Sequence, residues 1–260
     1  MGRAGGNRIE FATVFNVRDL GGYRTPFGTT RPRRFMRAGD TMFLSDDDLH
    51  RLLDLGVRRV VDLRMGVERP ELSDRLAHVS EVTWSNAVMV DERAMTPEWT
   101  RTGRVVAYLL EGYRRMLLDY ASIRTIFSFM SQARRGECVL FHCASGMDRT
   151  GLVSALVLGV AGVSREDLVA DYAYAFASDE EADEALATWD PALPPPPHDG
   201  TLARIHTMFA TCDWLVRQYG SVRQYLLQAG VAQSELDRIV AHLLGTDDNR
   251  RMRRAGPQNR

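Results

Sequence analysis

A cysteine and an arginine lie six positions apart in the string HCASGMDRTG, which covers residues 142–151. A short apolar run from Cys138 to Phe141 precedes this string and predicts a buried strand. After it, an apolar helix is expected from about Arg149 to Ala161. Cys143 is therefore expected at a turn between a strand and a helix.

A loop of this length can turn its backbone N–H groups inward around one small anion, and the positive end of the following helix adds to their field. Glycine lets the backbone approach such a ligand closely, and the guanidinium of Arg149 can bind two oxygens at once. The same field favours the nucleophilic thiolate of Cys143. Phosphate is therefore expected to bind to the loop residues Ala144, Ser145, Gly146 and Met147.

The chemistry that follows is attack of the Cys143 thiolate on phosphorus, which gives a phosphocysteine that water then hydrolyses. Asp148 is the nearest carboxyl group in the sequence. We expect it to protonate the leaving oxygen and then to activate the water. The Thr150 hydroxyl is placed to stabilise the departing thiolate. The alternative is a structural cysteine beside an aspartate that caps a helix.

The string resembles the active-site loop of the bacterial tyrosine-phosphatase-like family, whose members read His-Cys-x-x-Gly-Lys-Asp-Arg-Thr-Gly. The resemblance implies Cys143 as nucleophile, Arg149 as phosphate clamp and Asp148 as acid and base. It also implies a cysteine-phosphatase α/β fold, in which a central, mostly parallel sheet is flanked by helices, with helical insertions and C-terminal helices. Met147 stands where the family usually has a lysine associated with activity on phosphoinositides, which puts such a substrate in doubt.

Two other segments are similar to the family, and each carries a candidate substrate-binding residue. The stretch NVRDLGGY, residues 16–23, contains Arg18, which either latches the N-terminal segment or contacts a ligand. The stretch VDLR, residues 61–64, contains Asp62 at the end of a predicted strand. Ligands bind at the carboxyl ends of strands in open α/β sheets, although a surface salt bridge is an equally simple role for Asp62.

Other acidic residues offer alternatives. Asp91 lies in a stretch, residues 86–104, that is rich in Met, Pro and charge. It competes with Asp148 as general acid, because the better-known tyrosine phosphatases supply this group from a mobile loop. Residues 86–104 and 176–200 are expected to form lids. Three successive aspartates, residues 46–48, could suggest a metal site, but the preceding Ser45 favours a helix cap. No metal or cofactor is expected.

The 260 residues, 45% of them hydrophobic, suit one large α/β domain. We expect a single phosphatase domain over residues 11–245, a flexible segment over residues 1–10 and a basic disordered tail over residues 246–260. The net charge of −1 argues against nucleic acid as a partner, and no apolar run approaches about 20 residues, so no membrane span is expected. Three cysteines show neither metal spacing nor a disulfide framework, which favours the cytoplasm.

Three functions remain open. The first is a phosphatase that acts on tyrosine or serine/threonine side chains of phosphoproteins. The second has the same chemistry but acts on a small phosphate ester, such as a sugar, a nucleoside or a biosynthetic intermediate. The third is a phosphate-binding module without turnover, against which the intact set of Cys143, Asp148 and Arg149 argues.

Overall fold

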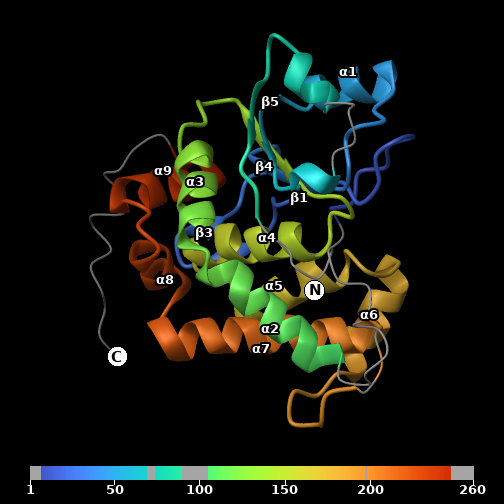
Figure 1. Cartoon of the computed structure of the whole chain (residues 1–260), viewed down its shortest axis with the longest axis vertical. Coiled ribbons are helices and arrows are strands. Elements are labelled where there is room, and N and C mark those ends of the chain that lie inside the picture. The colour runs from blue at the N-terminus through green and yellow to red at the C-terminus, as the bar shows by residue number, and fades with distance from the viewer. Residues whose placement is uncertain (1–6, 69–73, 90–104, 197, 199, 247–260) are drawn as a thin grey trace.

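A mostly parallel sheet lies at the centre of the fold. The computed structural model describes residues 7–68, 74–89, 105–196, 198 and 200–246. The sheet has the strand order β1-β4-β7-β5-β6 (Figure 1). Strands β4, β7, β5 and β6 run parallel, and β1 is antiparallel to β4. The strands are β1 (Arg18–Asp19), β4 (Phe35–Ala38), β5 (Val57–Asp62), β6 (Thr83–Asn86) and β7 (Cys138–His142); a separate hairpin pairs β2 (Arg24–Thr25) with β3 (Gly28–Thr29).

Helices cover both faces of this sheet (Figure 1). Helix α4 packs against α5, α5 against α7, and α7 against α2. The helices are α1 (Asp46–Asp54), α2 (Val105–Leu118), α3 (Tyr120–Met130), α4 (Asp148–Val160), α5 (Arg165–Ala173), α6 (Asp179–Thr188), α7 (Thr201–Tyr219), α8 (Val222–Gln228) and α9 (Gln233–Leu244). The expected α/β class, with C-terminal helices, is therefore confirmed.

Strand β7 divides the hydrophobic core. Its side chains alternate between faces, as in any strand. Val139 and Phe141 belong to the large cluster shared with α2, α4, α5 and α7, whereas Leu140 belongs to a smaller cluster that includes Leu52 of α1. All five residues of β7 are buried, which explains why the segment reads as a continuous apolar run.

The strand ends align beside the loop that follows β7. His142, the last residue of β7, pairs in register with Ala38 at the end of β4 and with Asp62 at the end of β5. Helix α4 then leads away from the loop and is buried along most of its length. A helix that is apolar on all sides is expected in such a position. The loop is thus fixed by a central strand on one side and a central helix on the other.

The acidic segment of residues 46–48 begins α1, as the capping interpretation predicts. Ser45 Oγ accepts a hydrogen bond from the Asp48 amide at 3.1 Å. The Asp48 carboxylate accepts hydrogen bonds from the backbone amides of Ala12 and Thr13. Asp48 therefore links the first turn of α1 to the N-terminal segment.

The predicted lids and tail are only partly described. Residues 90–104 and 247–260 lie outside the described residues. Within 176–200, α6 begins with a capping box formed by Ser178 and Glu181.

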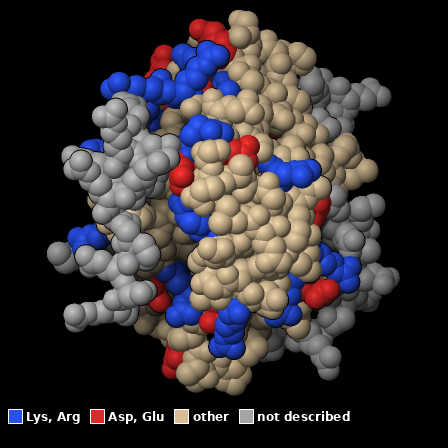
Figure 2. All heavy atoms as spheres, turned by 90° about the vertical axis from the view of Figure 1, so that its left-hand side faces the viewer, with Lys and Arg blue, Asp and Glu red and all other residues tan. Residues whose placement is uncertain are grey.

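On the face in Figure 2, small groups of basic side chains alternate with acidic and neutral ones. Among the described residues, no helix is both long and apolar enough to cross a bilayer.

Candidate active site

The loop from Cys143 to Met147 is held from outside through its carbonyl oxygens. The Asp40 amide donates to the Ala144 carbonyl at 3.1 Å, and Arg37 Nη2 donates to the Gly146 carbonyl at 2.8 Å. Asn16 Nδ2 donates to the carbonyls of Ser145 and Gly146 at 3.3 and 3.2 Å. Because these donors bind the carbonyls, the loop is braced in one conformation at the N-terminus of α4.

Gly146 is required by the path of this loop. Its φ of +68° lies in the left-handed region. A Cβ atom there would lie 2.7 Å from the backbone of Ala38 and Gly39, so a side chain cannot be accommodated without moving β4 or the loop. From the sequence we expected Gly146 to let the backbone approach a ligand closely; the close neighbour in the structure is the end of β4.

Cys143 lies at the base of the loop with 1% of its surface exposed. Thr150, in the first turn of α4, donates its hydroxyl to Cys143 Sγ at 3.1 Å. A hydroxyl donor stabilises a thiolate, and so does the positive end of α4. The two residues therefore lie together as the motif predicts.

Arg149 points its guanidinium at Glu68, just after β5. Nη1 and Nη2 each lie 2.5 Å from one carboxylate oxygen of Glu68. Burial raises the pKa of Glu68, but hydrogen bonds from Arg149 and the Met65 amide outweigh burial and lower it. Glu68 thus orients the arginine expected to clamp phosphate. Glu68 lies shortly after the VDLR stretch in the sequence, but the sequence did not indicate that Arg149 is its partner.

Asp148 receives donors from three other helices. Tyr113 of α2, Tyr172 of α5 and Arg204 of α7 all donate to its Oδ1, the last two at 3.0 Å. Both tyrosines are fully buried and Arg204 is 8% exposed. Sequence reasoning missed these three residues, because each lies at least 24 positions from Asp148 and carries no recognisable motif.

Two other predicted substrate contacts, Arg18 and Asp62, bind partners away from the loop. Arg18 is buried, donates to the Tyr174 carbonyl and pairs with Asp179 at 3.1 Å, which is the geometry of a latch. Asp62 is fully buried and binds Arg64, so the structure does not bring its carboxylate to the loop. Met147 lies in the loop and is half-buried. Asp91 lies outside the described residues.

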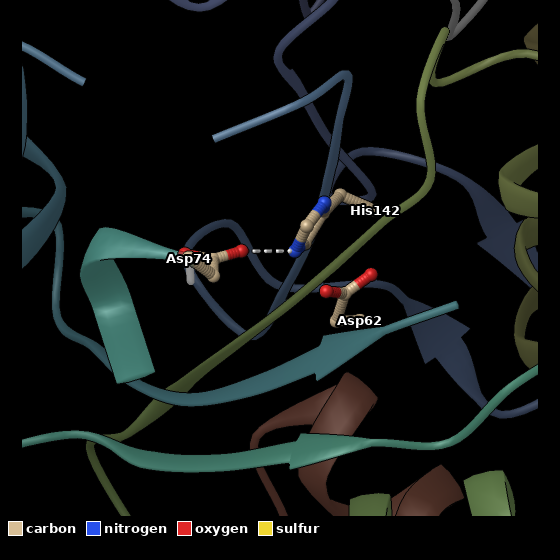
Figure 3. Close-up of side chains that lie close together, drawn as sticks. All are labelled: Asp62, Asp74 and His142. Atoms are coloured by element: carbon tan, nitrogen blue, oxygen red, sulfur yellow. Dashed lines mark ion pairs between the residues drawn. The ribbon is translucent and has the colours of Figure 1, made fainter. Parts of the chain in front are cut away.

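A buried charged cluster lies behind the loop (Figure 3). Asp62, Asp74 and His142 could by type hold a metal ion, since one ligand atom from each lies within 4.8 Å of the others. However, Arg64 binds Asp62 through Nε and Nη2 at 3.0 and 2.9 Å and lies 3.4 Å from Asp74. Because this guanidinium binds both oxygens of Asp62 and would repel a second cation, the set does not fit a metal.

The cluster is connected to the active-site loop at two points. His142 immediately precedes Cys143, and its Nε2 lies 3.0 Å from Asp74 Oδ2. Asp40, whose amide binds the loop, places its Oδ1 2.5 Å from Arg64 Nη1. The cluster therefore supports the loop from beneath.

The chain is similar to known proteins over most of its length. Residues 9–245 match the tyrosine phosphatase family. A Cupriavidus necator protein, whose name places it among the tyrosine-protein phosphatases, is 35% identical over 179 residues, which cover 65% of this chain. That match spans 63% of the relative's length, a little under two thirds.

Two further relatives match a larger share of the chain. A tyrosine-protein phosphatase of Nostoc commune is 28% identical over 80% of this chain and 74% of its own length. The triple specificity protein phosphatase PtpB of Mycobacterium tuberculosis is 27% identical over 91% of this chain and 99% of its own length. The predictions of the family, of its fold and of a phosphatase enzyme are confirmed: the chain belongs to the tyrosine phosphatase family.

Proposed function

We propose that the protein is a metal-independent phosphomonoester hydrolase of the tyrosine or dual-specificity type that works through a phosphocysteine. The observation that carries the proposal is the buried Cys143 thiol at the N-terminus of α4, 3.1 Å from the Thr150 hydroxyl. Family membership and the relatives' names support phosphatase activity. A phosphate in the loop would lie against the thiolate, the loop amides and Arg149.

The reaction has two steps. In the first, the Cys143 sulfur forms a bond to phosphorus while the bond to the leaving oxygen breaks, and Asp148 donates a proton to that oxygen when it needs one. In the second, water attacks phosphorus, Asp148 accepts its proton and the thiolate departs, stabilised by Thr150. Arg149 and the loop amides balance the charge on the equatorial oxygens in both steps. Glu68 keeps Arg149 in position.

The substrate is a phosphorylated protein or a small phosphate ester. Exposed Phe15 favours a phosphorylated aromatic side chain: its ring covers Gly39, 2.7 Å from where a Cβ of that residue would lie, and Gly39 borders the loop. A small metabolite is the second candidate, since Met147 removes the cation that the related loops carry. The M. tuberculosis relative is named for triple specificity, so several substrate classes need testing.

Phosphate release by wild type and Cys143→Ser, with a chelator present, tests the proposal. The substrates are phosphopeptides, phosphoinositides, nucleotides and sugar phosphates. We expect release that depends on Cys143 and favours phosphotyrosine. A preference for one metabolite by orders of magnitude would favour the second candidate. Absence of any release that depends on Cys143 would leave a binding module.

We further infer a cytoplasmic location, because a reducing compartment protects a thiolate nucleophile from oxidation. All three cysteines are free, which supports this inference. Fractionation of the source cells with an antibody against the protein would test it, and recovery outside the cytoplasm would overturn it.

A further inference from the structure

The backbone amides of the active-site loop point away from the donors that hold its carbonyls. The carbonyls of Ala144, Ser145 and Gly146 are each bound from outside the loop. Every peptide bond in the described part of the chain is trans, so an amide N–H points opposite to the carbonyl of the preceding residue. The outside donors therefore turn the amides of residues 145–147 toward the other side. Successive N–H groups with this orientation form a concavity that binds anions.

The peptide unit between Gly146 and Met147 depends most on such support. Glycine rotates more freely than any other residue, and Gly146 already has a φ of +68°. Its carbonyl accepts hydrogen bonds from Arg37 Nη2 at 2.8 Å and from Asn16 Nδ2 at 3.2 Å. The bond from Arg37 is the shorter one, and its positive charge makes it the stronger one. Arg37 is thus the main constraint on the direction of the Met147 amide.

Arg37 is itself fixed in place by a carboxylate on another helix. It is fully buried on β4, and its Nη1 lies 2.6 Å from Asp171 Oδ2 on α5. The other oxygen of Asp171 accepts from the Tyr23 hydroxyl at 2.9 Å. Burial, and next the charge of Asp171, raise the pKa of Tyr23 well above its ordinary value, so this phenol remains a donor. One arm of the guanidinium is therefore anchored on α5, while the other binds the loop.

We propose that Arg37 is a positioning residue that aims the Met147 amide at the phosphoryl group, and that Asp171 holds Arg37 in place for this task. The inference rests on the proposed function. Because Arg37 is fully buried, it acts through the Gly146 carbonyl and not by contact with substrate. An amide that is already aimed at the equatorial oxygens stabilises their charge without any reorganisation during the reaction.

Arg37→Met is compared with Asp171→Asn to test the proposal. Both substitutions break the buried ion pair, but only the first removes the donor to Gly146. We expect kcat/KM on an aryl phosphate to fall about 30-fold in Arg37→Met and only about fivefold in Asp171→Asn, against roughly 100-fold for outright loss of an oxyanion donor. Arg37→Lys keeps the charge beside Asp171 but lacks the planar fork, so its loss should be intermediate. This variant serves if Arg37→Met does not fold.

A buried arginine elsewhere in the sheet provides the matched control. Arg59 on β5 is 6% exposed, donates to the Gln132 carbonyl and lies over the ring of Phe129. Arg59→Met therefore removes a buried cation from the same sheet without removing a donor to the loop. Rates are referred to the folded fraction of each variant, measured by circular dichroism. We expect kcat/KM of Arg59→Met to equal that of wild type.

A second readout follows the Met147 amide directly. Protein labelled with ¹⁵N-methionine is titrated to saturation with inorganic phosphate, and the Met147 resonance is identified by its loss in Met147→Leu. We expect phosphate to move this resonance strongly downfield in wild type and much less in Arg37→Met. No shift in wild type, a shift of wild-type size in folded Arg37→Met, or equal losses of kcat/KM in Arg37→Met and Asp171→Asn would overturn the proposal.

The titration also separates this proposal from the proposed function. If wild type shows no phosphate release that depends on Cys143, the proposed function fails. Binding of inorganic phosphate requires no turnover, so the Met147 resonance still decides whether Arg37 aims the amide.

Discussion

Replacing Asp74 by Asn removes the carboxylate on which the buried cluster behind the active site depends. The Asp74 side chain is fully buried. It accepts hydrogen bonds from the Thr41 hydroxyl at 2.6 Å, the Leu76 amide at 2.9 Å and His142 Nε2 at 3.0 Å. The Asn amide has the same shape but no charge, so it imitates a protonated Asp74.

The free energy involved follows from the pKa of this carboxyl. Burial raises the pKa of Asp74, but hydrogen bonds and charge from His142, with further hydrogen bonds from Thr41 and Leu76, outweigh burial and lower it from 3.8 to about 2. At about 1.4 kcal/mol per unit, the charged form stabilises the folded state by ~2.5 kcal/mol at neutral pH. Because the folded pKa is the lower one, this contribution is complete above the unfolded value and is lost as pH falls through about 2.

Urea unfolding of wild type and Asp74→Asn at pH 7 and pH 3 measures the contribution. We expect Asp74→Asn to be less stable by ~2.5 kcal/mol at pH 7 and by only ~1.3 kcal/mol at pH 3, where the charged form is already partly lost. Asp47→Asn, which removes an exposed acid from α1, is the matched control. Equal gaps at the two pH values, or a gap under about 0.5 kcal/mol at pH 7, would refute this account of the cluster.

Three further predictions concern the loop and its acid. Gly146→Ala should lower kcat/KM on the order of 100-fold, because the new Cβ forces the loop away from Ala38; wild-type kinetics would show that the loop tolerates the shift. Met147→Lys should raise phosphate release from phosphoinositides several-fold, since it adds a cation; an unchanged substrate profile would assign specificity to other segments. Asp148→Asn should slow alkyl phosphates more than aryl phosphates; equal losses in kcat/KM would transfer the acid role to Asp91.

The sequence was most informative where the chemistry is local. The strand, loop and helix around Cys143 follow one another within a short segment, so periodicity and a turn-forming glycine sufficed to place them. The apolar helix expected from about Arg149 to Ala161 is α4, which spans Asp148–Val160. The cap of α1 was likewise visible, because Ser45 and the aspartates that follow it are neighbours in the sequence.

Contacts across long sequence separations were not accessible in this way. Glu68 and Arg149 are 81 positions apart, and Arg204 and Asp148 are 56 apart. The rule that ligands bind at the carboxyl ends of strands correctly placed Asp62 at the end of β5. It could not predict that Arg64 binds this carboxylate and makes it part of a buried cluster. The choice between latch and ligand for Arg18 likewise depended on Asp179, which only the fold brings near.

The central claim is that the phosphoryl group is transferred from the substrate to the Cys143 sulfur before water releases it as phosphate. Wild-type enzyme is mixed with an aryl phosphate, quenched within the first turnovers and digested, and the peptide that contains Cys143 is examined by mass spectrometry. We predict one phosphoryl group on the Cys143 sulfur. A phosphoryl group on another residue, or rapid turnover with none on Cys143, would contradict it.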